Sequence, residues 1–208
     1  MPLSITATME NDMSTHTNVD IDELNTILLE KLNGTAHTFD SFDHVDVNDN
    51  ALGREEMTAE YLRSITVSSL PLGALQLRIG APLMLMRNLD PQHGLCNGTR
   101  MTLLRASHHC LGVRLNGGQF DGQSREIYPY ALSTSEPLNF RLTRTQFPVK
   151  LAFAMTFYKT QGQTLDHAVI DLRHRISAHG QLYIALSRIT NISHLSLLLS
   201  ADNFESKI

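Results

Sequence analysis

The residues with the most informative chemistry form one polar hexapeptide, Lys159-Thr-Gln-Gly-Gln-Thr164, which lies between two apolar runs. These runs, residues 151–157 and 167–172, have the composition of strands buried on both faces. In an open α/β sheet, ligands bind beyond the carboxyl ends of the strands, and a glycine such as Gly162 allows a phosphate to approach the backbone. The placement therefore predicts a polyphosphate-binding loop.

An arginine, Arg188, follows at the end of a helix-like stretch that begins at Gly180. A guanidinium near a γ-phosphate stabilises the charge that builds on the equatorial oxygens during phosphoryl transfer. The alternative for Arg188 is a cap at the carboxyl end of its helix or an ion pair on the surface. The alternative for the hexapeptide is a polar connection whose side chains satisfy backbone groups.

These segments belong to a series of ordered blocks: residues 75–91, 94–100, 147–165 and 179–188. Together they resemble the C-terminal part of the Pif-type (petite integration frequency) ATP-dependent DNA helicases, including the Helitron-like branch of these RecD-related superfamily-one enzymes. The similarity runs from about Asn18 to Leu199. The resemblance implies roles in DNA repair, DNA recombination and telomere maintenance, and a nuclear or mitochondrial location.

The fold that the resemblance implies is α/β: the second RecA-like motor domain of the usual pair, interrupted by a small SH3-like β-barrel. The motor domain would comprise residues 18–72 and 147–208, and the inserted barrel residues 73–146. The residues themselves favour this division. A helix is predicted from Asp20 to about Gly34, a surface loop over residues 40–56, and short strands at 81–87, 99–105 and 110–115, separated by Asn-Gly turns. Residues 1–17 show no clear periodicity and are predicted to be a disordered start.

The resemblance also implies roles for individual residues. Arg188 is the expected arginine finger and the catalytic residue. The side of the hexapeptide that faces the nucleotide is Gly162, Gln163 and Thr164, and the expected contacts to single-stranded DNA are Tyr158, Lys159, Thr160, Asn97 and Arg100. Two positions depart from the family pattern: Tyr158 stands where histidine or asparagine is more frequent, and Tyr130 stands where arginine is common.

Bulk composition sets limits on the partners. The 208 residues are 42% hydrophobic, which is enough for a real core, and no apolar run approaches the roughly 20 residues needed to cross a bilayer. The net charge is −4, but residues 1–70 carry 13 acids and 3 bases whereas residues 71–208 carry 8 acids and 14 bases. The basic part bears the motifs, which favours contacts with phosphates. His108, His109, Cys110 and Cys96 lack the paired spacing of a metal site, so none is predicted.

A motor of this class needs a phosphate-cradling Gly-x-x-x-x-Gly-Lys-Ser/Thr loop, and no glycine in this sequence is followed by lysine. ATP and Mg²⁺ are therefore expected for a complete enzyme that includes a further RecA-like domain, in cis or in trans, and not for this chain alone. The main hypothesis is the C-terminal portion of a DNA helicase, inactive by itself. The alternative is a non-enzymatic nucleic-acid-binding fragment or a transposon-derived remnant.

Overall fold

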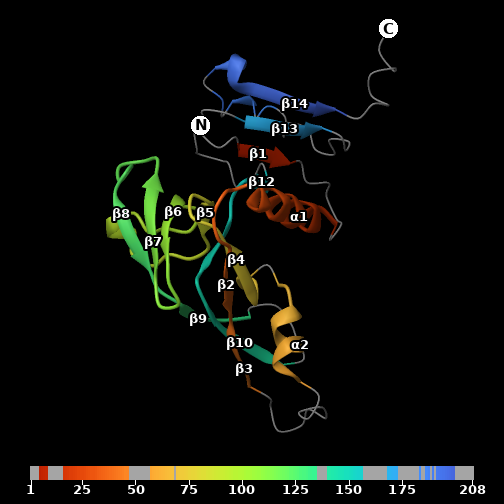
Figure 1. Cartoon of the computed structure of the whole chain (residues 1–208), viewed down its shortest axis with the longest axis vertical. Coiled ribbons are helices and arrows are strands. Elements are labelled where there is room, and N and C mark those ends of the chain that lie inside the picture. Colours follow the sequence, from red (N-terminus) through yellow and green to blue (C-terminus); the bar gives the residue numbers. More distant parts are fainter. Residues whose placement is uncertain are drawn as a thin grey trace. The chain divides into compact units, whose positions relative to one another are not determined.

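The computed structural model describes residues 5–8, 16–46, 57–67, 69–134, 140–156, 168–172 and 191–199, together with positions 183, 186, 187 and 189. The chain forms two compact units (Figure 1). The discontinuous unit comprises Met1–Lys31 and Leu151–Ile208, and the inserted unit comprises Leu32–Lys150. None of the described helices is long and apolar enough to span a membrane.

The discontinuous unit contains a four-stranded, fully parallel sheet with the strand order β12-β1-β13-β14. The strand predicted after the hexapeptide is confirmed as β13, and the one predicted before it, over residues 151–157, is confirmed only in part as β12, because Leu151 ends a strand of another sheet. The described elements of this unit are β1 (Ile5–Thr8), α1 (His16–Glu30), β12 (Ala154–Thr156), β13 (Ala168–Leu172), the 3-10 helix η4 (Ile192–His194) and β14 (Leu195–Leu199).

The N-terminal segment differs from the sequence-based expectation. Residues 1–17 were predicted to be disordered, whereas Ile5–Thr8 forms a central strand of the parallel sheet, paired with β12 on one side and β13 on the other. The segment is only four residues long, so its own pattern is too short to reveal a strand. Its pairing partners lie far away in the sequence, and they supply the hydrogen bonds that define it.

The predicted N-terminal helix is confirmed as α1, although it begins at His16 rather than Asp20 and ends at Glu30. Over residues 21–30, where the burial of its side chains is described, the buried positions are Ile21, Asn25 and Leu29, at intervals of four residues. This spacing places the three side chains on one face of the helix. The helix packs against β12, which belongs to the same unit.

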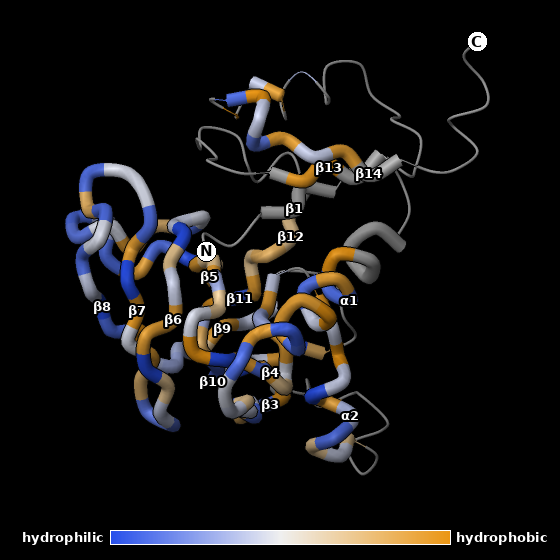
Figure 2. The backbone as a smooth tube through the Cα atoms, turned by 45° about the horizontal axis from the view of Figure 1, so that its top comes forward, coloured by the Kyte–Doolittle hydropathy of each residue, from blue (hydrophilic) through white to orange (hydrophobic). Residues whose placement is uncertain are grey.

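The inserted unit is built from antiparallel strands. Its largest sheet has the order β11-β5-β6-β7-β8, and the three strands and the Asn-Gly turns predicted between residues 81 and 118 are confirmed. Figure 2 shows the alternation of polar and apolar positions along β7, which matches its alternate burial, and in β6 the same alternation of burial holds from Arg100 to Leu103. These elements are β5 (Pro82–Leu85), the 3-10 helix η2 (Pro91–His93), β6 (Arg100–Ala106), β7 (Leu111–Asn116), β8 (Ser124–Ile127) and β11 (Val149–Leu151).

The inserted unit also contains a three-stranded sheet, β3-β10-β9, and a two-stranded sheet, β2-β4. Residues 40–46 were predicted to be loop, but they contribute to β2 and β3. The compact inserted unit starts at Leu32, because β3 pairs with β10 about a hundred residues later in the chain, and the bounds expected for a motor domain and a barrel stay predictions. The elements are β2 (His37–Asp40), β3 (Phe42–Asp46), α2 (Ala59–Ser64), β4 (Ala74–Leu77), β9 (Tyr130–Ser133) and β10 (Arg141–Gln146).

A buried ion pair joins β3 to β10. The Arg144 side chain is fully buried, and its Nε and Nη2 donate to the two carboxylate oxygens of Asp43 at 2.9 Å each. Such two-pronged pairing between a planar guanidinium and a carboxylate is among the strongest polar contacts in proteins. The pair fixes the register of β3 against β10.

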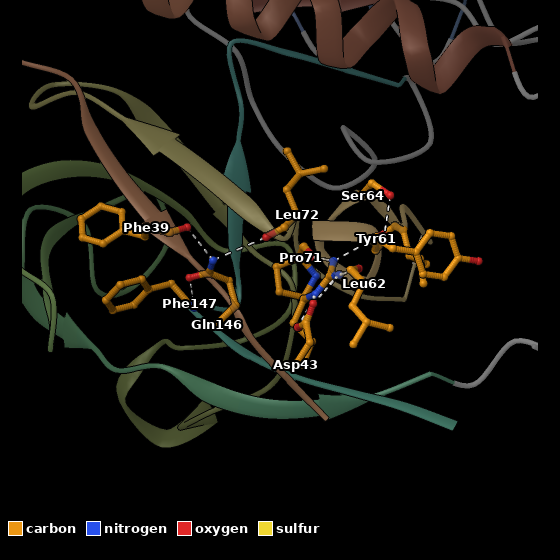
Figure 3. A network of polar contacts seen from close by, with 11 residues as sticks. Phe39, Asp43, Tyr61, Leu62, Ser64, Pro71, Leu72, Gln146 and Phe147 are labelled. Atoms are coloured by element: carbon orange, nitrogen blue, oxygen red, sulfur yellow. Dashed lines mark hydrogen bonds and ion pairs between the residues drawn. The ribbon is translucent and has the colours of Figure 1, made fainter. Parts of the chain in front are cut away.

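The remaining donors of Arg144 go to backbone carbonyls at the end of α2 and in the segment after it. Nη2 donates to Leu62 O at 2.6 Å, and Nη1 donates to Ile65 O at 3.1 Å and to Pro71 O at 3.0 Å. Figure 3 shows Asp43, Leu62 and Pro71 converging on this point. All five N–H groups of the guanidinium are thus satisfied, and the Leu62 carbonyl, which also accepts the Ile65 N–H at 3.2 Å, takes a second hydrogen bond from it.

A second close contact holds the segment after α2. A Cβ added at Gly73 would lie 2.3 Å from the carbonyl oxygen of Arg63 and 2.6 Å from its Cα. The Gly73 carbonyl also accepts the Ser41 N–H at 2.7 Å. Only glycine fits between the end of α2 and β2.

We expect Arg144→Met to lower the free energy of unfolding by about 3–5 kcal/mol, because it leaves the Asp43 carboxylate buried without a partner. Urea unfolding followed by circular dichroism measures the change. Arg141→Met, an exposed arginine on the same strand, is the matched control and should change stability by less than about 0.5 kcal/mol. Equal stability of the two variants would contradict the role of the ion pair.

We expect Gly73→Ala to destabilise the protein by roughly 1–3 kcal/mol, because the new methyl group meets backbone atoms that have no freedom to move aside. Ala74→Ser, at the exposed neighbouring position, serves as the control. Thermal unfolding of the two variants tests this directly. A midpoint for Gly73→Ala at or above that of the control would show that the segment relaxes.

Candidate functional site

Most residues of the predicted nucleotide and DNA site lie outside the described residues. This holds for Tyr158, Lys159, Thr160, Gly162, Gln163, Thr164 and Arg188. Their roles stay predictions. The described neighbours are the strands that precede and follow the hexapeptide in the chain: β12 ends at Thr156, and β13 begins at Ala168.

The parallel sheet fixes where the hexapeptide leaves its strand. Because all four strands run in the same direction, their carboxyl ends share one edge of the sheet, where ligands bind in open α/β folds. The hexapeptide begins three residues after the carboxyl end of β12. This connectivity supports the position that the sequence predicted for a ligand-binding loop.

A side chain from α1 holds β12 in place. The Asn25 carboxamide donates from Nδ2 to the Ala154 carbonyl at 3.1 Å and accepts the Ala154 N–H through Oδ1 at 2.9 Å. Both residues are buried, and β12 is the end strand of the sheet. The carboxamide therefore satisfies backbone groups of an edge strand, as a further strand would. The Asn25 carboxamide therefore anchors β12 at Ala154, two residues before the strand ends at Thr156.

Sequence reasoning missed Asn25, although a signal was present. Ile21, Asn25 and Leu29 occupy equivalent positions on the helix, so a polar residue interrupts an apolar stripe. A buried carboxamide needs partners for its donor and its acceptor. The interruption therefore indicates a specific polar contact, but the sequence does not reveal which backbone group it meets.

The described residues before Arg188 form a short turn of helix. The Ser187 N–H donates to the Tyr183 carbonyl at 2.9 Å, and the Tyr183 side chain is 76% exposed. This agrees with the helix-like character predicted for the stretch that ends at Arg188. The functional role of the arginine itself is not tested by these contacts.

Asn97 is exposed in the connection between η2 and β6. Its backbone N–H donates to Asn88 Oδ1 at 2.7 Å, and Gly98, with a φ of 87°, donates to Leu85 O at 2.8 Å. The Thr99 hydroxyl donates to Gly94 O at 2.9 Å and so closes the base of the loop. These contacts hold the loop through its backbone and leave the Asn97 carboxamide at the surface.

Arg100 begins β6, three residues after Asn97, opposite Met84 on β5 and Asn116 on β7. Desolvation by the surrounding protein lowers the pKa of Arg100 to about 10. This value is well above neutral pH, so the guanidinium remains charged. A partly buried cation and an exposed carboxamide in one connection can contact a phosphate and a base edge, respectively.

Aromatic and sulfur-containing side chains outside the predicted site have structural roles or lie at the surface. Phe39 is a core residue whose ring packs edge to face against Phe147, with 5.2 Å between the ring centroids. Phe42 is 75% exposed. Both cysteine thiols are free, and no group of three or more metal-binding side chains occurs among the described residues.

Comparison with known proteins identifies relatives of this chain. Residues 60–105 match the family described as "DNA helicase Pif1, 2B domain". The chain is 38% identical over 127 residues to the ATP-dependent DNA helicase PIF1 of Danio rerio and 32% identical over 180 residues to that of Homo sapiens. These alignments cover 60% and 86% of this chain, but only 19% and 26% of the relatives.

A crystal structure of Bacteroides Pif1 bound to ssDNA has the same fold as this chain, with a TM-score of 0.65 at 23% identity over 93% of this chain and 40% of that one. The fold is therefore one shared with solved Pif1 helicases. By its relatives, the chain belongs to the Pif1 family, as the sequence predicted. It spans about a fifth to a quarter of the two relatives described above.

Replacing Asn25 should loosen β12. We expect Asn25→Leu to cost about 1–3 kcal/mol of unfolding free energy, because it leaves the N–H and the carbonyl of Ala154 buried without partners. Thr26→Ala, on the exposed side of the same helix, is the control and should lie within about 0.5 kcal/mol of the wild type. Urea unfolding curves that coincide for the two variants would argue against the anchor.

Proposed function

We propose that this chain supplies the second RecA-like motor domain of a Pif1-type DNA helicase, with the inserted unit in the place of its SH3-like barrel. The observation that carries the proposal is the parallel sheet of a Pif1-family chain, in which the hexapeptide follows the carboxyl end of β12. The antiparallel character of the inserted unit supports the second part of the proposal. Its described sheet, which ends at β11 and β8, does not by itself define a closed barrel.

In this proposal the chain provides one wall of an ATP site. Arg188 acts as the arginine finger that stabilises charge on the transferring phosphoryl group, and Gly162, Gln163 and Thr164 contact the nucleotide. ATP and Mg²⁺ are held by a phosphate loop on a further RecA-like domain, in cis or in trans. The chain contains no Gly-Lys pair from which such a loop could be built.

Single-stranded DNA is the proposed partner of the other groups. Lys159 and Thr160 donate to phosphates, with Tyr158 beside them, and Asn97 and Arg100 contact the strand from the inserted unit. The charge of Arg100 and the exposure of Asn97 support this assignment. A contact of the hexapeptide with both nucleotide and DNA would couple ATP hydrolysis to movement along the strand.

A second candidate function is a nucleic-acid-binding fragment without enzymatic activity, such as a transposon-derived remnant. The absence of a Gly-Lys pair in these 208 residues favours it over an autonomous motor. The two candidates share the DNA contacts and differ in whether Arg188 serves a catalytic purpose. Addition of a Pif1 segment that carries the phosphate loop separates them.

We expect the purified 208-residue chain to bind a fluorescent oligothymidylate in a salt-dependent manner and to show no DNA-stimulated ATP hydrolysis. Arg100→Ala should weaken binding and lower the slope of log K against log salt by about 0.7, the contribution of one phosphate contact on a single strand. Fluorescence anisotropy at several salt concentrations measures both effects. Arg141→Ala, an exposed arginine on β10, is the control.

The outcomes discriminate among the proposals. ATP hydrolysis by the chain alone would refute the statement that it is one half of a cleft. Hydrolysis that appears only when a segment with a phosphate loop is added, and that disappears in Arg188→Ala, would support the motor role. If the chain binds DNA but the added segment produces no ATP hydrolysis, the non-enzymatic fragment is the better description. If the chain neither binds DNA nor supports hydrolysis, both proposed functions are wrong.

A further inference from the structure

The outer face of the five-stranded sheet in the inserted unit contains a hollow of about 610 Å³ that is open to solvent. It lies over β6, β7 and β8, and the residues that matter below are Leu104, Arg105, Gly112, Ser124, Glu126 and Tyr128. All of them belong to the inserted unit. None is among the residues for which the Pif1 resemblance implied a role.

Gly112 lies in the lining of the hollow at the middle of β7, and a Cβ added there would lie 3.3 Å from Arg105 Cβ and 3.6 Å from Arg105 Nε. Gly112 faces outward between the buried Leu111 and Val113, and it pairs with Arg105 on one side and Glu126 on the other. A β-bulge between Leu103 and Arg105 locally breaks the regular pairing of β6 with β7. A glycine in a strand often marks a place where another molecule approaches the backbone.

A chain of hydrogen bonds fixes the aromatic wall of the hollow. The Tyr128 hydroxyl donates to Glu126 Oε2 at 2.6 Å, and Arg105 Nη2 donates to Glu126 Oε1 at 2.7 Å. The hydrogen bond from Tyr128 is the main cause that lowers the pKa of Glu126, so the carboxylate stays ionised at neutral pH. Tyr128 is held by its hydroxyl, yet its side chain is 57% exposed.

The same face carries an excess of positive charge. Arg114 lies two residues from Gly112 on the outer side of β7, between Thr102 and Ser124, and Arg100 lies opposite Asn116 at the next outward position. Three positive charges lie on this face, on Arg100, Arg105 and Arg114, and one negative charge, on Glu126. The Arg114 side chain is exposed, and within the described part of the chain it makes no hydrogen bond or ion pair.

From this geometry we propose that the hollow receives one unpaired base of a single-stranded nucleic acid, stacked on Tyr128, with the adjoining phosphates on Arg114 and Arg100. The proposal rests on the proposed function. It extends the path of the single-stranded nucleic acid from Arg100 along the outer face of β7. The aromatic ring of Tyr128 and the apolar side chain of Leu104 suit the faces of any base, so the site discriminates little between sequences. The cations suit the backbone that links the bases.

The test uses the complete 208-residue chain and a fluorescein-labelled oligothymidylate. Tyr128→Ala should weaken binding by about five-fold or more, as expected for loss of one base–aromatic stack. Tyr128→Phe keeps the ring and should stay within about two-fold of the wild type. Tyr61→Ala, which removes a similarly exposed tyrosine on α2 of the same unit, is the matched control and should bind like the wild type.

A second readout does not depend on the stability of a variant. An oligonucleotide that carries 5-iodouracil, irradiated with the wild-type chain, should cross-link to the peptide containing Tyr128, as mapped by mass spectrometry. Leu104→Glu, which places a negative charge at the edge of the hollow, should reduce that cross-link. If Tyr128→Ala fails to fold, the cross-link and Leu104→Glu still decide the matter.

Each outcome bears on a distinct statement. If the wild-type chain does not bind the oligonucleotide, the proposed function and this inference both fail. If it binds, but Tyr128→Ala binds equally well and no cross-link forms at Tyr128, the hollow is not part of the DNA path and the proposed function stands. If oligoglutamate competes for binding and loses affinity in Tyr128→Ala while the oligonucleotide does not, the surface serves an acidic protein partner instead.

Discussion

The inserted unit depends on one buried guanidinium. Arg144 contributes five donors, and each meets an acceptor: two on Asp43 and one each on Leu62, Ile65 and Pro71. A buried charge is tolerated only when its hydrogen bonds are complete, so these acceptors have to be in place together. The guanidinium therefore ties β3, β10 and the end of α2 into one arrangement, beside a small apolar cluster of Leu62, Leu70, Leu132 and Leu142.

This arrangement supports the five-stranded sheet through Gln146, at the end of the same strand. Its Nε2 donates to Phe39 O at 2.9 Å, and its Oε1 accepts the Phe147 N–H at 2.9 Å (Figure 3). The chain then continues through Pro148, whose carbonyl accepts the Met86 N–H at 2.8 Å, into β11 beside β5. Polar side chains thus set the path of the backbone between the two sheets.

The sequence predicted the parts of the fold whose signals are local. The strands β5, β6 and β7 are marked by alternation and by Asn-Gly turns, and α1 is marked by apolar residues at helical spacing. The parts that were missed depend on distant partners. The sequence of β3 predicts an acidic surface loop, because it contains charged residues such as Asp43. The burial of the Asp43 carboxylate is explained only by Arg144, which lies opposite on β10.

The candidate site divides in the same way. The hexapeptide and Arg188 are recognisable in the sequence because their residue types and their order are distinctive. Asn25 and the hollow at Gly112 are not recognisable in the sequence. The role of Asn25 depends on a backbone group 129 residues away, and the hollow depends on the pairing of β7 with β6 and β8. Long-range pairing carries no local signal, so only the folded chain reveals these features.

The discontinuous layout also bears on how the protein acquires its shape during translation. The ribosome delivers β1 and α1 first and β12, β13 and β14 last, with the whole of Leu32–Lys150 between them. Domains generally fold as units once their residues are available, and contacts between distant residues form slowly. The interior segment can therefore mature on the nascent polypeptide while the first helix still waits for the sheet that will cover Asn25.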